Sequence, residues 1–154
     1  MDVVTAVICA VMIDLTVNFS MRALLVQLDF LPTNGKTKLA DLALLTTWVR
    51  IIIEDPLMEE ILFRGPLAAV AYKYKQFERV IAWTLISSIL FGLAHGGPAN
   101  ILMQGLGGIT YSVVFLKSGG LHGNPLKGLL ASSSCHALFN LIVGTMAVLG
   151  QRPH

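Results

Sequence analysis

The sequence is divided into apolar segments that approach or reach the length of a membrane-crossing helix. Such a helix needs about 20 mostly apolar residues, with a range of about 17–25. Six segments can be marked, running from about Val3 to Leu28, Leu39 to Glu54, Pro56 to Tyr72, Val80 to His95, Pro98 to Leu116 and Leu126 to Leu149. They predict an all-α fold, a polytopic transmembrane bundle of about six apolar helices that forms a single membrane domain over residues 1–154.

The composition excludes an ordinary soluble domain. Apolar residues make up 55% of the chain and charged residues only 13%, against about 25% charged residues in a soluble domain. The net charge of +2 is small and no basic run occurs, which argues against a nucleic-acid partner. Cys9 and Cys135 lie in apolar stretches and are interpreted as small core residues. We therefore expect an integral, multi-pass membrane protein surrounded by the lipid bilayer.

The segment boundaries carry residues that punctuate helices. Asp55 is a plausible N-cap, and Pro56 follows it where the first turn of a helix tolerates proline. Gly92 and Gly96 are four residues apart, a spacing that lets two helix backbones approach closely. These features predict a helix start at residue 55 and a close helix contact through the fourth segment.

Basic residues in the loops predict the orientation, since such loops stay in the cytoplasm. If all six segments cross, the three loops with basic residues fall on one side. Glu59 and His95 then lie close to the opposite face. The basic residues are Lys36 and Lys38, then Lys73, Lys75 and Arg79, then Lys117 and Lys127.

Three short clusters place ionisable groups inside apolar segments. A charged side chain at a helix centre costs about 2.5–3.5 kcal/mol even on the lenient insertion scale, so each cluster requires an explanation. All three lie within residues 55–149. They are Glu59-Glu60 with Arg64, Phe91 with His95, and His136 with Asn140.

Helix geometry predicts how these side chains pair. Residues four apart share a helix face, so Glu60 can form an ion pair with Arg64 in the favourable order. Glu59 is then about 100° around the helix and faces another partner. By the same spacing, the Phe91 ring can form one wall of the His95 imidazole, and His136 and Asn140 point the same way.

The residue types in these clusters are those of amide hydrolysis without a covalent nucleophile. A desolvated glutamate is a competent general base near neutral pH, and a neighbouring histidine can share a water molecule with it. A second histidine and an asparagine amide are donors that can hold the oxyanion of a tetrahedral intermediate. Together the clusters contain the groups for a general base, a positioned water molecule and an oxyanion hole.

Other functions use the same residue types. Glu59, His95 and His136 could supply a zinc ligand set, although no His-Glu-x-x-His helix preorganises it. A transporter with a proton relay also places Glu and His in the membrane, but the sequence has no recognisable inverted repeat. A non-enzymatic membrane partner would keep the buried network for stability alone. The favoured hypothesis, amide hydrolysis, needs no cofactor, and its substrate is a membrane-presented peptide or protein.

The order of the three motifs resembles a known family. Glu59-Glu60-x-x-x-Arg64, Phe91-x-x-x-His95 and His136-x-x-x-Asn140 are similar to the motifs of the CPBP intramembrane proteases, the CAAX-prenyl-endopeptidase and bacteriocin-self-immunity family. The resemblance implies a glutamate-dependent endopeptidase in a helical membrane core. It assigns the base to Glu59, a role in holding the water to His95, and supporting roles to Glu60 and Arg64. It also implies that His136 and Asn140 form the oxyanion hole. It also implies CAAX-type processing as one use, and a non-proteolytic immunity or scaffold protein as the alternative.

Overall fold

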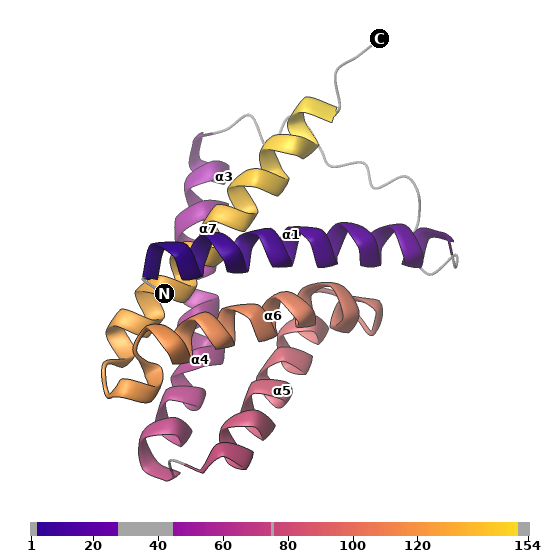
Figure 1. The fold of residues 1–154 in the computed structure, drawn as a ribbon. Coiled ribbons are helices and arrows are strands. Elements are labelled where there is room, and N and C mark those ends of the chain that lie inside the picture. Colours follow the sequence, from indigo (N-terminus) through magenta and orange to yellow (C-terminus); the bar gives the residue numbers. More distant parts are fainter. Residues whose placement is uncertain (1–2, 28–44, 75, 151–154) are drawn as a thin grey trace.

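The computed structural model describes residues 3–27, 45–74 and 76–150, and this part of the chain is helical with no strand. The predicted all-α bundle is therefore confirmed (Figure 1). The elements in chain order are α1 (Val3–Gln27), α3 (Leu45–Val49), the π-helical turn η1 (Arg50–Glu54), α4 (Asp55–Tyr74), α5 (Phe77–Ala94), α6 (Ala99–Ser118), the short 3-10 helix η2 (Gly120–His122) and α7 (Pro125–Gly150).

Four of the described helices are long and apolar enough to cross a membrane. The apolar windows lie in α1, α5 and α7, and in a stretch that covers α6 and η2. Only 22–44% of each window is buried inside the protein, so most of the apolar surface of these helices faces outward. An outward apolar surface is stable in contact with lipid, and the protein is an integral, multi-pass membrane protein.

The second and third apolar segments form one continuous helix in the structure. α3, η1 and α4 follow one another without a break from Leu45 to Tyr74. Asp55 is helical (φ −61°, ψ −49°), and its N–H donates to the carbonyl of Arg50, five residues earlier. The predicted helix start with Asp55 as N-cap is therefore wrong. The Asp55 carboxylate instead forms an exposed ion pair with Arg50 at 3.3 Å.

Proline explains why the helix widens at this point. Inside a regular α-helix, Pro56 would remove one hydrogen bond and its ring would collide with the carbonyl four residues earlier. The π turn directly before Pro56 changes the hydrogen-bond register from four residues to five, so the chain passes the proline without ending the helix. Such turns occur as single insertions in α-helices, often at functional sites.

Small residues bring α5 and α6 into backbone contact. A Cβ atom added to Gly92 would lie 2.5 Å from the Cα of Ile101, and one added to Gly108 would lie 3.2 Å from the Cα of Ser88. The predicted close contact through Gly92 is confirmed. Gly96 does not take part in it, because Gly96 lies in the turn after α5 with φ of +113°.

The bundle has its core where α1, α5, α6 and α7 meet. Figure 1 shows α1 lying along α6 and crossing α7, and these helices contact one another. Phe91, Tyr111 and Cys135 are buried at the centre of this core, and Ala10 and Val11 of α1 close it from one side. Phe63 packs against this core from α4, the helix that carries the first motif, and the core thus brings the three motifs together.

The continuous helix changes the predicted topology. One side of the helix bundle carries the basic residues Lys73, Arg79, Lys117 and Lys127. These residues lie at the end of α4, the start of α5, the end of α6 and the start of α7. Leu45 lies at the far end of the 45–74 helix, so two separate crossings by the second and third segments are excluded. The expected loop with Lys36 and Lys38 lies outside the described residues.

Glu59 also lies farther from the ends of its helix than predicted, because it is part of a longer helix. It lies 14 residues from Leu45 and 15 from Tyr74, which places it about 21–23 Å from either end at 1.5 Å per residue. The expectation that Glu59 lies near a membrane face assumed a helix start at residue 55. His95 directly follows the last residue of α5, as expected.

Labelling of single cysteines can test this topology, in a background in which Cys9 and Cys135 are replaced by alanine. Cysteines introduced at Thr46 and Pro98 should react with a membrane-impermeant reagent from one side, and a cysteine at Arg79 from the other. The reason is that one helix separates residue 46 from residue 79, and α5 separates residue 79 from residue 98. Labelling of positions 46 and 79 from the same side would contradict a single crossing by the 45–74 helix.

Candidate active site

A fully buried ion pair lies at the inner end of the site. The Nε of Arg64 is 3.0 Å from Glu60 Oε2, and neither side chain is exposed, so the predicted pair is confirmed. Arg64 also donates from Nη1 to Ser87 Oγ at 3.3 Å and from Nη2 to the Gly108 carbonyl at 3.0 Å. The guanidinium thus joins α4 to α5 and α6, and it lies 5.9 Å from the centroid of the Phe91 ring.

Glu59 lies between two histidines that come from different helices. Its Oε2 is 3.7 Å from His95 Nε2 and 3.7 Å from His136 Nε2. The prediction that Glu59 faces partners other than Arg64 is confirmed. The side chains of Glu59 and His95 are each 29% exposed, whereas that of His136 is only 5% exposed. Glu59 and His95 therefore form the accessible part of the cluster.

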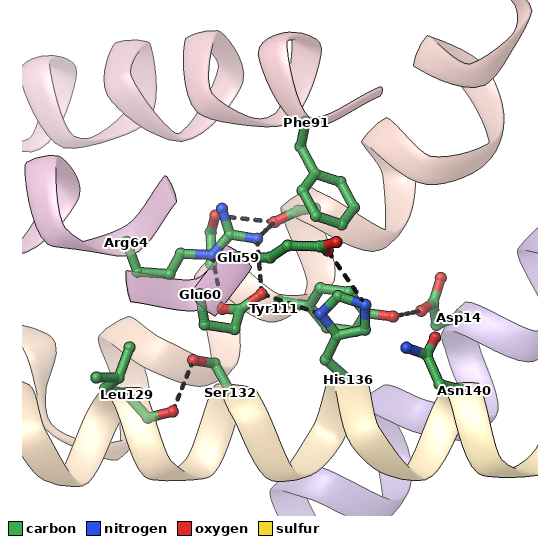
Figure 2. Close-up of polar contacts among 12 residues, drawn as sticks. Asp14, Glu59, Glu60, Arg64, Phe91, Tyr111, Leu129, Ser132, His136 and Asn140 are labelled. Atoms are coloured by element: carbon green, nitrogen blue, oxygen red, sulfur yellow. Dashed lines mark hydrogen bonds and ion pairs between the residues drawn. The ribbon is translucent and has the colours of Figure 1, made fainter. Parts of the chain in front are cut away.

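His136 connects the accessible glutamate to the buried one. Its Nε2 faces Glu59, and its Nδ1 is 3.5 Å from Glu60 Oε1. Figure 2 shows the imidazole between the two carboxylates, with Arg64 beyond Glu60. Acidic and basic groups alternate along this series, so each carboxylate has a basic group on both sides.

The two histidines are held by aromatic rings and by the backbone. Phe91 contacts His95 with ring centroids 4.5 Å apart, as predicted, and it meets His136 edge-on at 5.7 Å. The Nδ1 of His95 lies 2.8 Å from the Phe91 carbonyl. Because a carbonyl can only accept, Nδ1 carries the proton in this contact, and a neutral His95 therefore presents its Nε2 lone pair toward Glu59.

Three further polar residues belong to the site and were not predicted from the sequence: Asp14, Asn18 and Tyr111. The Tyr111 ring stacks on His136 at 4.6 Å, with 17° between the ring planes. Its hydroxyl donates to Asp14 Oδ2 at 2.7 Å, and Asn18 donates to Asp14 Oδ1 at 2.8 Å. Asp14 and Asn18 are four residues apart inside an apolar segment, so they share one face of the helix. This spacing is the sequence feature that would have predicted a common polar partner for the two side chains. Gly107 leaves the space for the Asp14 carboxylate.

Asn140 contacts the π turn. Its Nδ2 donates to the Ile51 carbonyl at 3.0 Å, and the side chain is half-buried. His136, one turn earlier on α7, points to the two glutamates (Figure 2). The two residues thus share a helix face, as predicted, but each contacts a different part of the helix from Leu45 to Tyr74.

The sequence also allowed a zinc set of Glu59, His95 and His136. The three side chains do meet, as their distances show. Within the described ranges, however, no group of three or more His, Cys, Asp or Glu side chains has the placement that would hold a metal ion.

The fold and the site define a polytopic helical membrane protein with an accessible glutamate between two histidines. Residues 41–142 match the family model described as Type II CAAX prenyl endopeptidase Rce1-like. The chain belongs to this family, and all three motifs lie within the matched residues. The family is one of membrane-embedded proteases, in agreement with the resemblance to the CPBP proteases. Neither the curated proteins nor the solved structures that were compared with the chain include a match.

Removal of Arg64 should destabilise the protein strongly. Arg64→Ala leaves Glu60 buried and without its cationic partner, and breaking a buried pair in this way costs about 3–5 kcal/mol. The matched control is Arg50→Ala, which breaks the exposed pair with Asp55 and should cost about 0–1 kcal/mol. Reversible unfolding in mild detergent measures both free energies. Equal losses would show that the Arg64–Glu60 pair does not support the fold.

Proposed function

We propose that this protein is an intramembrane endopeptidase in which Glu59 and His95 activate a water molecule for attack on a peptide bond. The observation that carries the proposal is the partly exposed Glu59 carboxylate, 3.7 Å from an imidazole nitrogen on each side. This separation is too long for a direct hydrogen bond. Among the described residues, the Glu59 Oε2 atom is buried and has no hydrogen-bond partner, and a water molecule that touches both Oε2 and His95 Nε2 would supply one.

The reaction needs one general base, and no covalent bond forms between the enzyme and the substrate. Glu59 takes a proton from the water while the water oxygen bonds to the peptide carbonyl carbon. His95 accepts the second hydrogen bond of the water at Nε2, because its Nδ1–H is held by the Phe91 carbonyl. The protonated Glu59 then gives the proton to the leaving amine as the carbon–nitrogen bond breaks. Glu59 thus acts as the base during the attack and as the acid during departure of the amine.

The oxyanion is held by donors from α7. His136 is fixed between Glu59 and Glu60 and stacks on Tyr111, so its orientation is set before substrate arrives. Asn140 has two amide N–H groups, of which one is donated to Ile51. The other is available to the oxyanion. Preorganised donors of this kind stabilise developing charge because they need not reorient during the reaction.

The substrate is a peptide presented within or at the membrane. Glu59 is close to the middle of a helix of membrane-spanning length, and the outward surface of the bundle is apolar. A peptide segment that enters from the lipid side can reach it without crossing a large aqueous surface. CAAX-type processing is the specific activity that the family description suggests.

Replacement of Glu59 by glutamine should abolish hydrolysis. Glu59→Gln preserves size but cannot take a proton, and the loss of a general base lowers the rate by about 10²–10⁴-fold. Cleavage of a fluorogenic membrane-presented peptide in proteoliposomes measures the rate. Glu78→Gln, at an exposed glutamate in the first turn of α5, is the control and should retain the parent rate. Full turnover by Glu59→Gln with unchanged thermal unfolding would refute Glu59 as the base.

Chelation separates this mechanism from a zinc-dependent one. If Glu59 and His95 activate the water by themselves, exhaustive treatment with a strong chelator should leave cleavage unchanged. The measurement pairs the cleavage rate with the metal content of the purified protein. Stoichiometric zinc, with activity lost on its removal and regained on its return, would favour a metallopeptidase that uses Glu59, His95 and His136 as ligands.

A further inference from the structure

The carbonyl of Ile51 has no main-chain donor at the π turn. In an α-helical register it would accept from the N–H of Asp55, but that N–H donates to Arg50. In the π-helical register it would accept from residue 56, which is a proline and has no N–H. The combination of the π turn and Pro56 therefore frees one carbonyl near the middle of the 45–74 helix.

The side chain of Asn140 supplies the missing donor. Its Nδ2 lies 3.0 Å from the Ile51 oxygen, across a contact between α7 and the 45–74 helix. Ile51 and Asn140 are both half-buried. A carbonyl without a donor is costly in a membrane protein, where water cannot replace the missing hydrogen bond. The asparagine is thus held by an acceptor that the backbone of the opposite helix leaves open.

One fixed hydrogen bond orients the whole amide group. The two N–H groups of an asparagine lie in one plane, so fixing one of them on Ile51 sets the direction of the other. Asn140 lies one helical turn beyond His136, whose Nε2 faces the Glu59 carboxylate. The hydrogen bond to Ile51 therefore limits rotation of the second N–H, which is the donor that the proposed function assigns to the oxyanion.

We infer that Pro56 and the π turn before it are a positioning device that aims the Asn140 amide at the oxyanion. The inference rests on the proposed function, in which Asn140 is an oxyanion donor. Pro56 contributes through Ile51 and Asn140 and is a positioning residue, not a catalytic one. It is buried and lies only three residues before Glu59, so the same helix turn fixes the base and the oxyanion donor relative to each other.

A double-mutant cycle of stability tests the structural half of the inference. Pro56→Ala restores an N–H at residue 56 and allows a backbone donor to reach Ile51. Asn140→Leu removes both amide donors and keeps the branched shape of the side chain. We expect Asn140→Leu to destabilise the parent protein and to have a clearly smaller effect when Pro56→Ala is also present. Additive effects would overturn the inference. If Asn140→Leu does not fold, the cycle is run with Asn140→Ala, and recovery of folded protein by Pro56→Ala supports the inference.

The second proline inside α4 provides a matched control. Pro66→Ala also restores an N–H inside the helix, at an exposed position ten residues further along. It should not change the effect of Asn140→Leu, because it creates no donor near Ile51. Equal relief by Pro66→Ala and Pro56→Ala would show a general gain in helix stability and would contradict a specific link to Asn140.

Kinetics test the positioning half. Pro56→Ala should lower kcat with KM nearly unchanged, and Asn140→Leu should lower kcat further, by about 10²–10³-fold for one lost oxyanion donor. The double variant should match Asn140→Leu alone, because an absent amide cannot be misdirected. A further drop in kcat in the double variant would overturn the positioning role. If Glu59→Gln retains full turnover while the stability cycle shows coupling, the proposed mechanism fails but the link between Pro56 and Asn140 stands.

Discussion

The structure depends on the burial of one guanidinium group. Arg64 has no exposed surface, and a bare cation in this environment would be strongly unfavourable. Its ion pair with Glu60 and its hydrogen bonds to Ser87 and the Gly108 carbonyl hold it from three helices. The close α5–α6 contact through small residues makes this possible, because it brings the Gly108 carbonyl within reach. The position of α4, and with it of Glu59, follows from the need to keep Arg64 fully paired.

The ion pair also organises the groups that are not fully buried. Glu60 is shared between Arg64 and His136, and His136 is in turn shared between Glu60 and Glu59. Because each carboxylate lies between two basic side chains, the series can be buried at its Arg64 end while its Glu59 end remains accessible. This arrangement explains how a chain with few charged residues concentrates several of them at one place. The stacked Tyr111 excludes water from the buried side of the imidazole.

Much of this arrangement follows from short-range helix geometry and was predicted from the sequence. The pairing of Glu60 with Arg64, the contact of Phe91 with His95 and the separate direction of Glu59 each depend only on spacing within one helix. The continuity of residues 45–74 was not predicted, since Asp55 followed by Pro56 is also the pattern of a helix start. The π turn that resolves the two alternatives has no simple sequence signature. Asp14 and Tyr111 meet only through the packing of α1 on α6, which no local spacing encodes.

A polypeptide with a complete site must include α1, because this helix supplies Asp14. The family match begins at residue 41, whereas Asp14, which accepts from the Tyr111 hydroxyl, comes from a helix before it. A fragment restricted to the matched residues would leave that hydroxyl buried without its acceptor and would open one face of the aromatic stack on His136. Three shared motifs are therefore necessary for the site in this protein but do not by themselves enclose it. A comparison of such proteins by motif alone overlooks a helix that shapes the same histidine from outside the matched region.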